Sequence, residues 1–149
     1  MPAPDEVTSP IVTLSQPNGL AITLGPALPK TVDGYEFIDF WMSIESDGLL
    51  ARTLVRTIEG GTGPYSLTQF VQELADDWKG ERSRRDFESI EHHFSIAASR
   101  DPLGHVLLRF THRESYLADS WEVRATAEVD AGEGMSAFAR CVHELFAGA

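Results

Sequence analysis

The chain has 149 residues, of which 42% are hydrophobic and 23% are charged, values typical of one soluble globular domain. Asp and Glu number 23 against 12 Lys and Arg, so the formal net charge is −11. This acidity argues against nucleic acid as the main partner, because phosphate binding needs clustered cations, and equally against an anionic membrane surface. No apolar run approaches the roughly 20 residues of a membrane span.

The ends of the chain and its cysteine content indicate a compartment. Cys141 is the single cysteine, which excludes an intramolecular disulfide and is typical of a reducing cytosol. Residues 1–10 hold three prolines and two acids, without the basic and apolar stretches of a signal peptide. We therefore expect a flexible acidic tail over residues 1–10, a single domain over residues 11–149, and a cytoplasmic protein.

Two dipeptides predict β-hairpins in the first third of the chain. Asn18-Gly19 and Asp47-Gly48 each separate two alternating apolar segments, and such dipeptides adopt the positive φ angles of type I′ turns. The expected strands are residues 11–15 with 20–25, and residues 35–46 with 49–58.

The second hairpin can be placed in register, because a two-residue loop sets Ser46 opposite Leu49. One face then carries the apolar side chains from Ile38 to Ile44 and should meet the core. The other face carries large apolar side chains and, beside them, an Asp–Arg pair of opposite charge. This composition is typical of protein-binding hot spots. It carries Phe37, Asp39, Trp41, Arg52, Leu54, Arg56 and Ile58.

A helix is predicted from Leu67 to about Lys79, begun by a capping box of Ser66 and Gln69. A charged loop over residues 81–86 should follow, and then a third hairpin turning at residues 101–104, with Phe94, Ile96 and Ala98 facing His112, Phe110 and Leu108.

A strand over residues 121–129 and a helix from about Glu133 to Phe146 complete the chain. The expected order is β-β-β-β-α-β-β-β-α. Strands joined by hairpins rather than crossovers imply an α+β fold, in which two amphipathic helices pack on an antiparallel sheet.

Motifs that would indicate catalysis are missing. No nucleophile elbow, phosphate loop or dinucleotide fingerprint occurs, so we expect no catalytic residue, no cofactor and no enzymatic activity. His92 and His112 should share the core side of the third hairpin. A zinc site needs at least three protein ligands, and these two histidines have no third ligand beside them, so no metal is predicted.

The mixed face of the second hairpin is the candidate partner surface, with Phe37, Asp39, Trp41, Arg52, Leu54 and Arg56 as its residues. The alternative, which the sequence slightly favours, is that a helix of the same chain covers this face. Two amphipathic helices need a surface on which to pack.

Several segments of the second half carry a resemblance. They are Phe70–Gly80, Glu88–Glu91, Gly104–Arg109, Trp121–Val123 and the segment Ala131-Gly132-Glu133. Together, over residues 65–147, they resemble an uncharacterised family of bacterial domains common in actinomycete-type genomes. More remotely they resemble the WapI-type immunity proteins, which neutralise a contact-delivered toxin. The resemblance implies a fold and supplies no catalytic residues.

These observations favour a non-catalytic domain that binds another protein. The sharper expectation is an immunity-like role, in which this acidic chain masks a basic toxin or effector. Two alternatives stay open: a small-ligand binder or enzyme with a pocket between sheet and helices, and an accessory domain that forms a homodimer. No nucleic acid and no membrane is expected as a partner.

Overall fold

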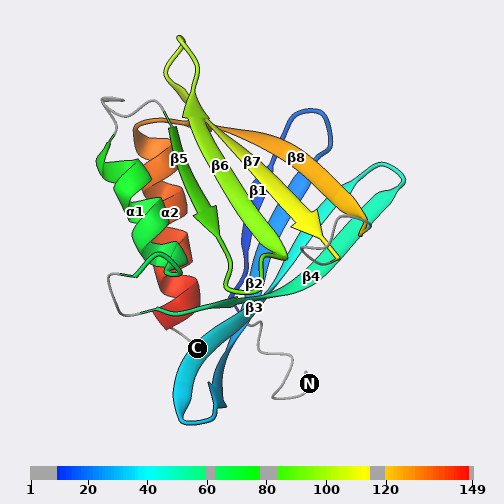
Figure 1. Ribbon diagram of the computed structural model, residues 1–149. Coiled ribbons are helices and arrows are strands. Elements are labelled where there is room, and N and C mark those ends of the chain that lie inside the picture. The colour runs from blue at the N-terminus through cyan, green and yellow to red at the C-terminus, as the bar shows by residue number, and fades with distance from the viewer. Residues whose placement is uncertain (1–9, 60–62, 78–83, 115–119, 148–149) are drawn as a thin grey trace, which may run out of the picture.

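The computed structural model describes residues 10–59, 63–77, 84–114 and 120–147 of the chain. Two four-stranded antiparallel sheets and two helices make up this part, with the sheet orders β1-β2-β3-β4 and β5-β6-β7-β8 (Figure 1). The elements are β1 (Val12–Ser15), β2 (Ala21–Val32), β3 (Tyr35–Ser46), β4 (Leu49–Thr57), α1 (Leu67–Asp76), β5 (Arg84–Glu88), β6 (Phe94–Arg100), β7 (His105–Arg113), β8 (Glu122–Asp130) and α2 (Glu133–Ala147).

The predicted α+β class and its hairpins are confirmed, with one strand and one sheet more than expected. The additional strand is β5. Its first three residues, 84–86, belong to the loop that the sequence predicts, because charged side chains dominate this segment. Phe87 supplies the inward side chain of this strand and is only 3% exposed. Residues 81–83 of the predicted loop, and nearly all of the predicted tail, lie outside the described residues.

Strand β2 extends well beyond its predicted end and turns into β3 at Asp33-Gly34. The register of β2 against β3 shifts between Leu24 and Ala27, where Gly25 adopts a φ of +112°. A Cβ atom on Gly25 would lie 2.7 Å from the carbonyl oxygen of Pro10 and 2.9 Å from Leu145 Cδ1. This glycine therefore allows α2 and the start of the chain to approach the sheet.

Both predicted registers are confirmed. In the β3–β4 hairpin Ser46 lies opposite Leu49 and Trp41 opposite Leu54. In the β6–β7 hairpin Phe94 lies opposite His112, and the turn closes with Gly104 at a φ of +86°. The type I′ turns predicted at Asn18-Gly19 and Asp47-Gly48 are wrong, because only the glycine of each pair has a positive φ. Loop length and side-chain alternation were sufficient for the registers.

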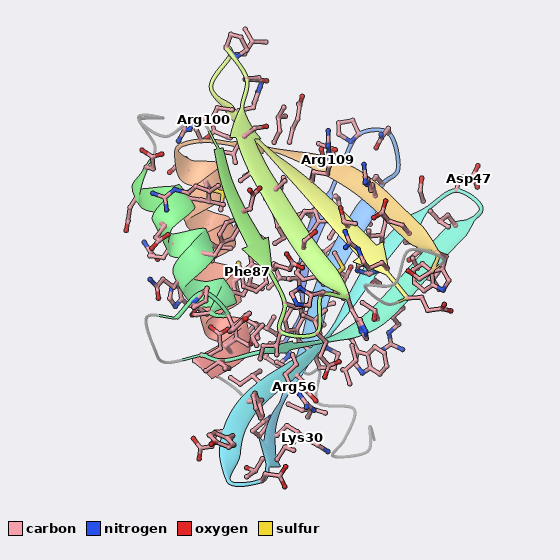
Figure 2. The ribbon with its side chains drawn as sticks, viewed as in Figure 1. Lys30, Asp47, Arg56, Phe87, Arg100 and Arg109 are labelled. Atoms are coloured by element: carbon pink, nitrogen blue, oxygen red, sulfur yellow. The ribbon has the colours of Figure 1, made fainter. Side chains whose placement is uncertain are left out.

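The core is one cluster to which both sheets and both helices contribute. The helices lie side by side along one side of the sheets (Figure 1). Phe146 of α2 packs against Phe40 of β3 with ring centroids 5.4 Å apart, and Phe70 of α1 packs against Phe87 of β5 at 5.6 Å. Figure 2 shows Phe87 between its strand and the helices. None of the described helices is long and apolar enough to cross a membrane.

Helix α1 begins at the predicted cap, but its first turn has an additional partner. The Gln69 N–H donates to Ser66 Oγ at 3.2 Å, as expected for an N-cap. The Gln69 side chain donates to Glu73 instead of returning to the cap, so the reciprocal half of the predicted capping box is wrong. Glu59, which precedes the helix, binds the first turn instead. Its carboxylate accepts from the N–H groups of Leu67 and Thr68 and from the Ser66 and Thr68 hydroxyls. A negative charge here complements the helix dipole.

Replacing Glu59 with alanine is expected to lower the free energy of unfolding by about 1–2 kcal/mol, because it leaves these first-turn donors without their carboxylate. Urea denaturation of the full chain measures the change. Glu144→Ala, at an exposed position of α2, is the control and should change stability by less than about 0.5 kcal/mol. Equal effects of the two substitutions would contradict a capping role for Glu59.

Candidate functional site

The six predicted partner-surface residues lie together on the outward side of β3 and β4. The register pairs Asp39 with Arg56, Trp41 with Leu54, and Ser43 with Arg52. Leu54 is 42% exposed and Ile58 41%, so neither of the described helices covers this face, contrary to the favoured alternative. The described helices instead pack against each other, with α2 also contacting β1, β2 and β8.

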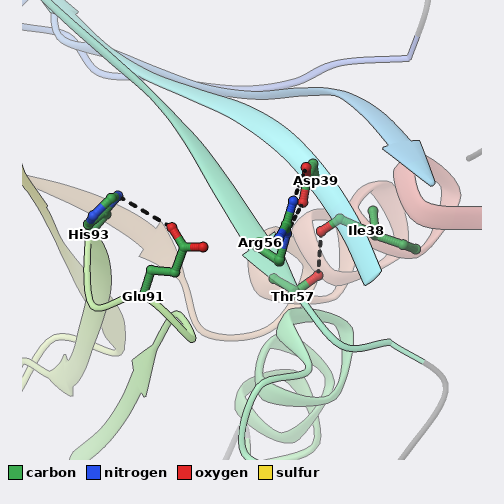
Figure 3. Close-up of polar contacts among 6 residues, drawn as sticks. All are labelled: Ile38, Asp39, Arg56, Thr57, Glu91 and His93. Carbon is green, nitrogen blue, oxygen red and sulfur yellow. Dashed lines mark hydrogen bonds and ion pairs between the residues drawn. The ribbon is translucent and has the colours of Figure 1, made fainter. Parts of the chain in front are cut away.

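The arginines of this face are held by aromatic rings and by one carboxylate. Arg52 lies over the Trp41 ring with its Cζ 4.1 Å from the centroid, and Arg56 lies 5.2 Å from the Phe37 centroid. Arg56 Nε and Nη2 donate to the two Asp39 carboxylate oxygens at 2.8 and 3.0 Å (Figure 3). The face is therefore preorganised, since its long cationic side chains already have fixed positions.

Asp39 is 6% exposed and the Arg56 side chain is half-buried, so their ion pair is partly shielded from water. The hydrogen bond from Arg56 to Asp39 raises the pKa of the Arg56 guanidinium, and the charges of Asp39 and Glu91 add to this effect. Glu91 itself forms an ion pair with His93 at 4.0 Å (Figure 3). The positive charge of Arg56 therefore persists at neutral pH.

Sequence reasoning missed the contribution of β2. Leu28 lies opposite Asp39 and is 59% exposed, and its strand was predicted to end at Gly25. Together these side chains form one surface, which we call the outward face: Leu28, Phe37, Asp39, Trp41, Arg52, Leu54, Arg56 and Ile58. It lies between the β2–β3 and β3–β4 turns, near which Figure 2 labels Lys30 and Asp47.

A second surface feature is a groove between α1 and β5. Its part between the two elements is a hollow of about 340 Å³, and an adjoining hollow of about 530 Å³ extends over β6. Pro64, Asp86 and Phe87 line both. Glu73 and Arg85 form an ion pair of 2.6 Å between α1 and β5. Three carboxylates, those of Glu73, Asp86 and Glu88, lie among the apolar and neutral polar side chains of the groove lining.

One family is found for the chain, the family of unknown function DUF6228, which matches residues 26–149. The chain belongs to this family. No curated protein and no solved structure matches it. The DUF6228 match reaches further toward the N-terminus than the resemblance drawn from residues 65–147 and includes the whole β3–β4 hairpin. The description of the DUF6228 family assigns no activity to its members.

The predicted pairing of His92 with His112 is wrong in this DUF6228 chain. His92 precedes β6, has a φ of 61° and contacts Glu88 from an exposed position. His112 is 0% exposed on the core side of β7. The prediction extended β6 by two residues, whereas a turn separates the two histidines into different environments.

A different cluster was missed. Asp101, His105 and Glu128 each offer one ligand atom, and these atoms lie within 4.8 Å of one another. Asp101 Oδ2 and His105 Nδ1 are 2.8 Å apart. This hydrogen bond, followed by the charge of Asp101, raises the pKa of His105. The backbone N–H of His105 makes the largest contribution to the lowered pKa of Asp101. The four-residue spacing across a turn was visible in the sequence, but the position of Glu128 depends on β8 pairing with β7.

Proposed function

We propose that this chain is a non-catalytic protein-binding domain and that its partner contacts the outward face. The observation that carries the proposal is a preorganised set of half-buried aromatic side chains, exposed apolar side chains and arginines on one sheet. Arg52 and Arg56 rest on Trp41 and Phe37, so little side-chain entropy is lost when a partner binds. Trp and Arg are the residue types most enriched at binding hot spots.

The finer proposal is an immunity-like role in a bacterial cell, in which the domain masks a basic toxin or effector. It is supported by the net charge of −11 and by the remote likeness of residues 65–147 to WapI-type immunity proteins. A basic partner would be steered by the acidic chain as a whole and anchored by apolar contacts at the outward face. Complementary charge then accelerates association, and added salt slows it.

Co-expression with the proteins encoded beside this chain tests the proposal. We expect one of them to co-purify with the wild type and its toxicity to be relieved. Leu54→Arg should abolish both effects, because it places a cation among the exposed apolar groups that a basic partner must approach. Trp41→Arg, which also removes the ring under Arg52, should do the same.

Thr126→Arg is the matched control, since it adds the same charge at an exposed position of β8 in the other sheet. It should leave co-purification unchanged. Equal loss in Leu54→Arg and Thr126→Arg would point to net charge rather than to the outward face. A wild-type dimer in light scattering that becomes a monomer in Leu54→Arg would support the homodimer alternative instead.

A small-ligand function has a separate observation in its favour, the groove between α1 and β5. A thermal-shift screen of the full chain tests it. A ligand at 100 times its dissociation constant should stabilise the fold by about 2.7 kcal/mol. Tyr65→Ala, at the groove wall, should remove that shift, whereas Leu54→Arg should retain it.

A further inference from the structure

The tip of the β6–β7 hairpin brings together three side chains that the proposed binding function does not use. Asp101 begins the turn, His105 is the first residue of β7, and Glu128 comes from β8, the next strand of the sheet. Their ligand atoms lie within 4.8 Å of one another although Glu128 is 23 residues away from His105 in sequence. The outward face lies on the other sheet, so the two features are independent.

The turn holds Asp101 in a defined orientation. Its Oδ1 accepts from the backbone N–H groups of Leu103 and His105, both at 2.9 Å. These two bonds fix the carboxylate plane and direct Oδ2 toward His105 Nδ1. Oδ1 of Asp101 therefore stabilises the turn, while Oδ2 faces the imidazole of His105.

Glu128 is anchored through its backbone and not through its carboxylate. Its N–H donates to Gln16 Oε1 at 3.0 Å, and its carbonyl accepts from Gln16 Nε2 at 3.4 Å. Within the described part of the chain its carboxylate makes no hydrogen bond or ion pair. An exposed carboxylate on a fixed backbone, beside an Asp–His pair, is free to rotate toward a shared ligand.

The three groups form a donor set of two carboxylate oxygens and one imidazole nitrogen. With a neutral imidazole they carry a charge of −2, which matches a divalent ion. Zn²⁺ binds such oxygen and nitrogen donors at about 2.0–2.2 Å, and three protein ligands plus water complete its coordination. The imidazolium form of His105 would release its Nδ1 proton to water as the ion binds, which leaves a neutral imidazole with its remaining proton on Nε2.

We propose that Asp101, His105 and Glu128 form a binding site for a divalent transition-metal ion of the Zn²⁺ type at the tip of the β6–β7 hairpin. The ion links this hairpin to β8, and water fills its remaining coordination positions. The site adds a further link between two elements that already pair as neighbouring strands. It is an addition to the proposed function and does not depend on it.

The test is calorimetric titration of Zn²⁺ into the full chain after treatment with a chelator and dialysis. We expect one site in the wild type. Glu128→Gln and His105→Gln should each weaken it by about tenfold or more. Co²⁺ in place of Zn²⁺ should give a visible absorption band that both substitutions remove. Thermal unfolding in chelator checks that the variants remain folded.

The His92–Glu88 pair provides a matched control, because it is an exposed histidine–carboxylate contact that belongs to no described three-ligand group. His92→Gln and Glu88→Gln should leave the calorimetric site unchanged. Absence of binding up to about 1 mM Zn²⁺ would overturn the proposal. So would an equal loss of binding in all four variants, since it would show adsorption to surface histidines and carboxylates. Neither result affects the proposal for the outward face, which is tested by co-purification.

Discussion

Phe94→Ala should lower the free energy of unfolding by about 3–5 kcal/mol, the largest effect expected of a single substitution in this chain. Phe94 is 1% exposed and lies where the two sheets meet. Its ring centroid is 6.3 Å from that of Phe40 in the other sheet and 6.1–6.2 Å from those of Phe110 and Phe87 in its own. Alanine would leave a cavity lined by these rings, which a rigid sheet on each side cannot close.

Urea denaturation at pH 7 measures this effect, and Leu103→Ala is its control. Leu103 is 81% exposed in the β6–β7 turn, so its truncation should change stability by less than about 0.5 kcal/mol. A loss below about 1.5 kcal/mol in Phe94→Ala would mean that the core relaxes into the vacated volume. The aromatic contact between the sheets would then be dispensable.

Acid should destabilise the protein through His112, well above the pH at which carboxylates titrate. His112 is fully buried, its Nε2 faces the Met42 sulfur, and its Nδ1 has no hydrogen-bond partner among the described residues. Burial lowers the pKa of His112 from 6.5 to about 4. Because the folded-state pKa lies below the unfolded one, the unfolded chain binds more protons between these two values. Stability is thus complete above about pH 7 and falls as the pH drops toward 4.

Linkage over this shift predicts a loss of roughly 2 kcal/mol between pH 7 and pH 5, and roughly 3 kcal/mol by pH 4. Urea denaturation at a series of pH values measures it. His112→Leu keeps a buried side chain of similar size and removes the titrating group, so its stability should depend much less on pH between 7 and 5. If the wild type and His112→Leu lost the same stability on acidification, His112 would not be the responsible group.

The hairpins and helices were predictable because each depends on neighbours in the chain. Asp47-Gly48 places Ser46 opposite Leu49 whatever the rest of the molecule does, and Ser66 begins α1 in the same local way. The six predicted partner-surface residues share one side of the β3–β4 hairpin for this reason. Alternation along two strands of known register decides which side chains are neighbours.

Strand β5 and the extension of β2 were missed because charge and proline hide their alternation. Phe87 is the one apolar side chain that β5 buries, and Pro26 and Pro29 interrupt the pattern of β2. Pairing with β6 and β3 supplies the hydrogen bonds that these segments lack by themselves. In these two segments the need to hydrogen-bond the backbone N–H and C=O groups therefore outweighs the weak local preference for a strand.

The sequence alone determined which residues of β3 and β4 belong to the outward face, the registers of two hairpins and the amphipathic character of both helices. Only the tertiary structure decided that the helices pack elsewhere and leave Leu54 exposed, that His112 is buried away from His92, and that Glu128 lies beside Asp101 and His105. The physical reason is the range of the forces involved. Turns and alternation act over a few residues, whereas exposure and ligand geometry depend on how the sheets and helices pack around one core.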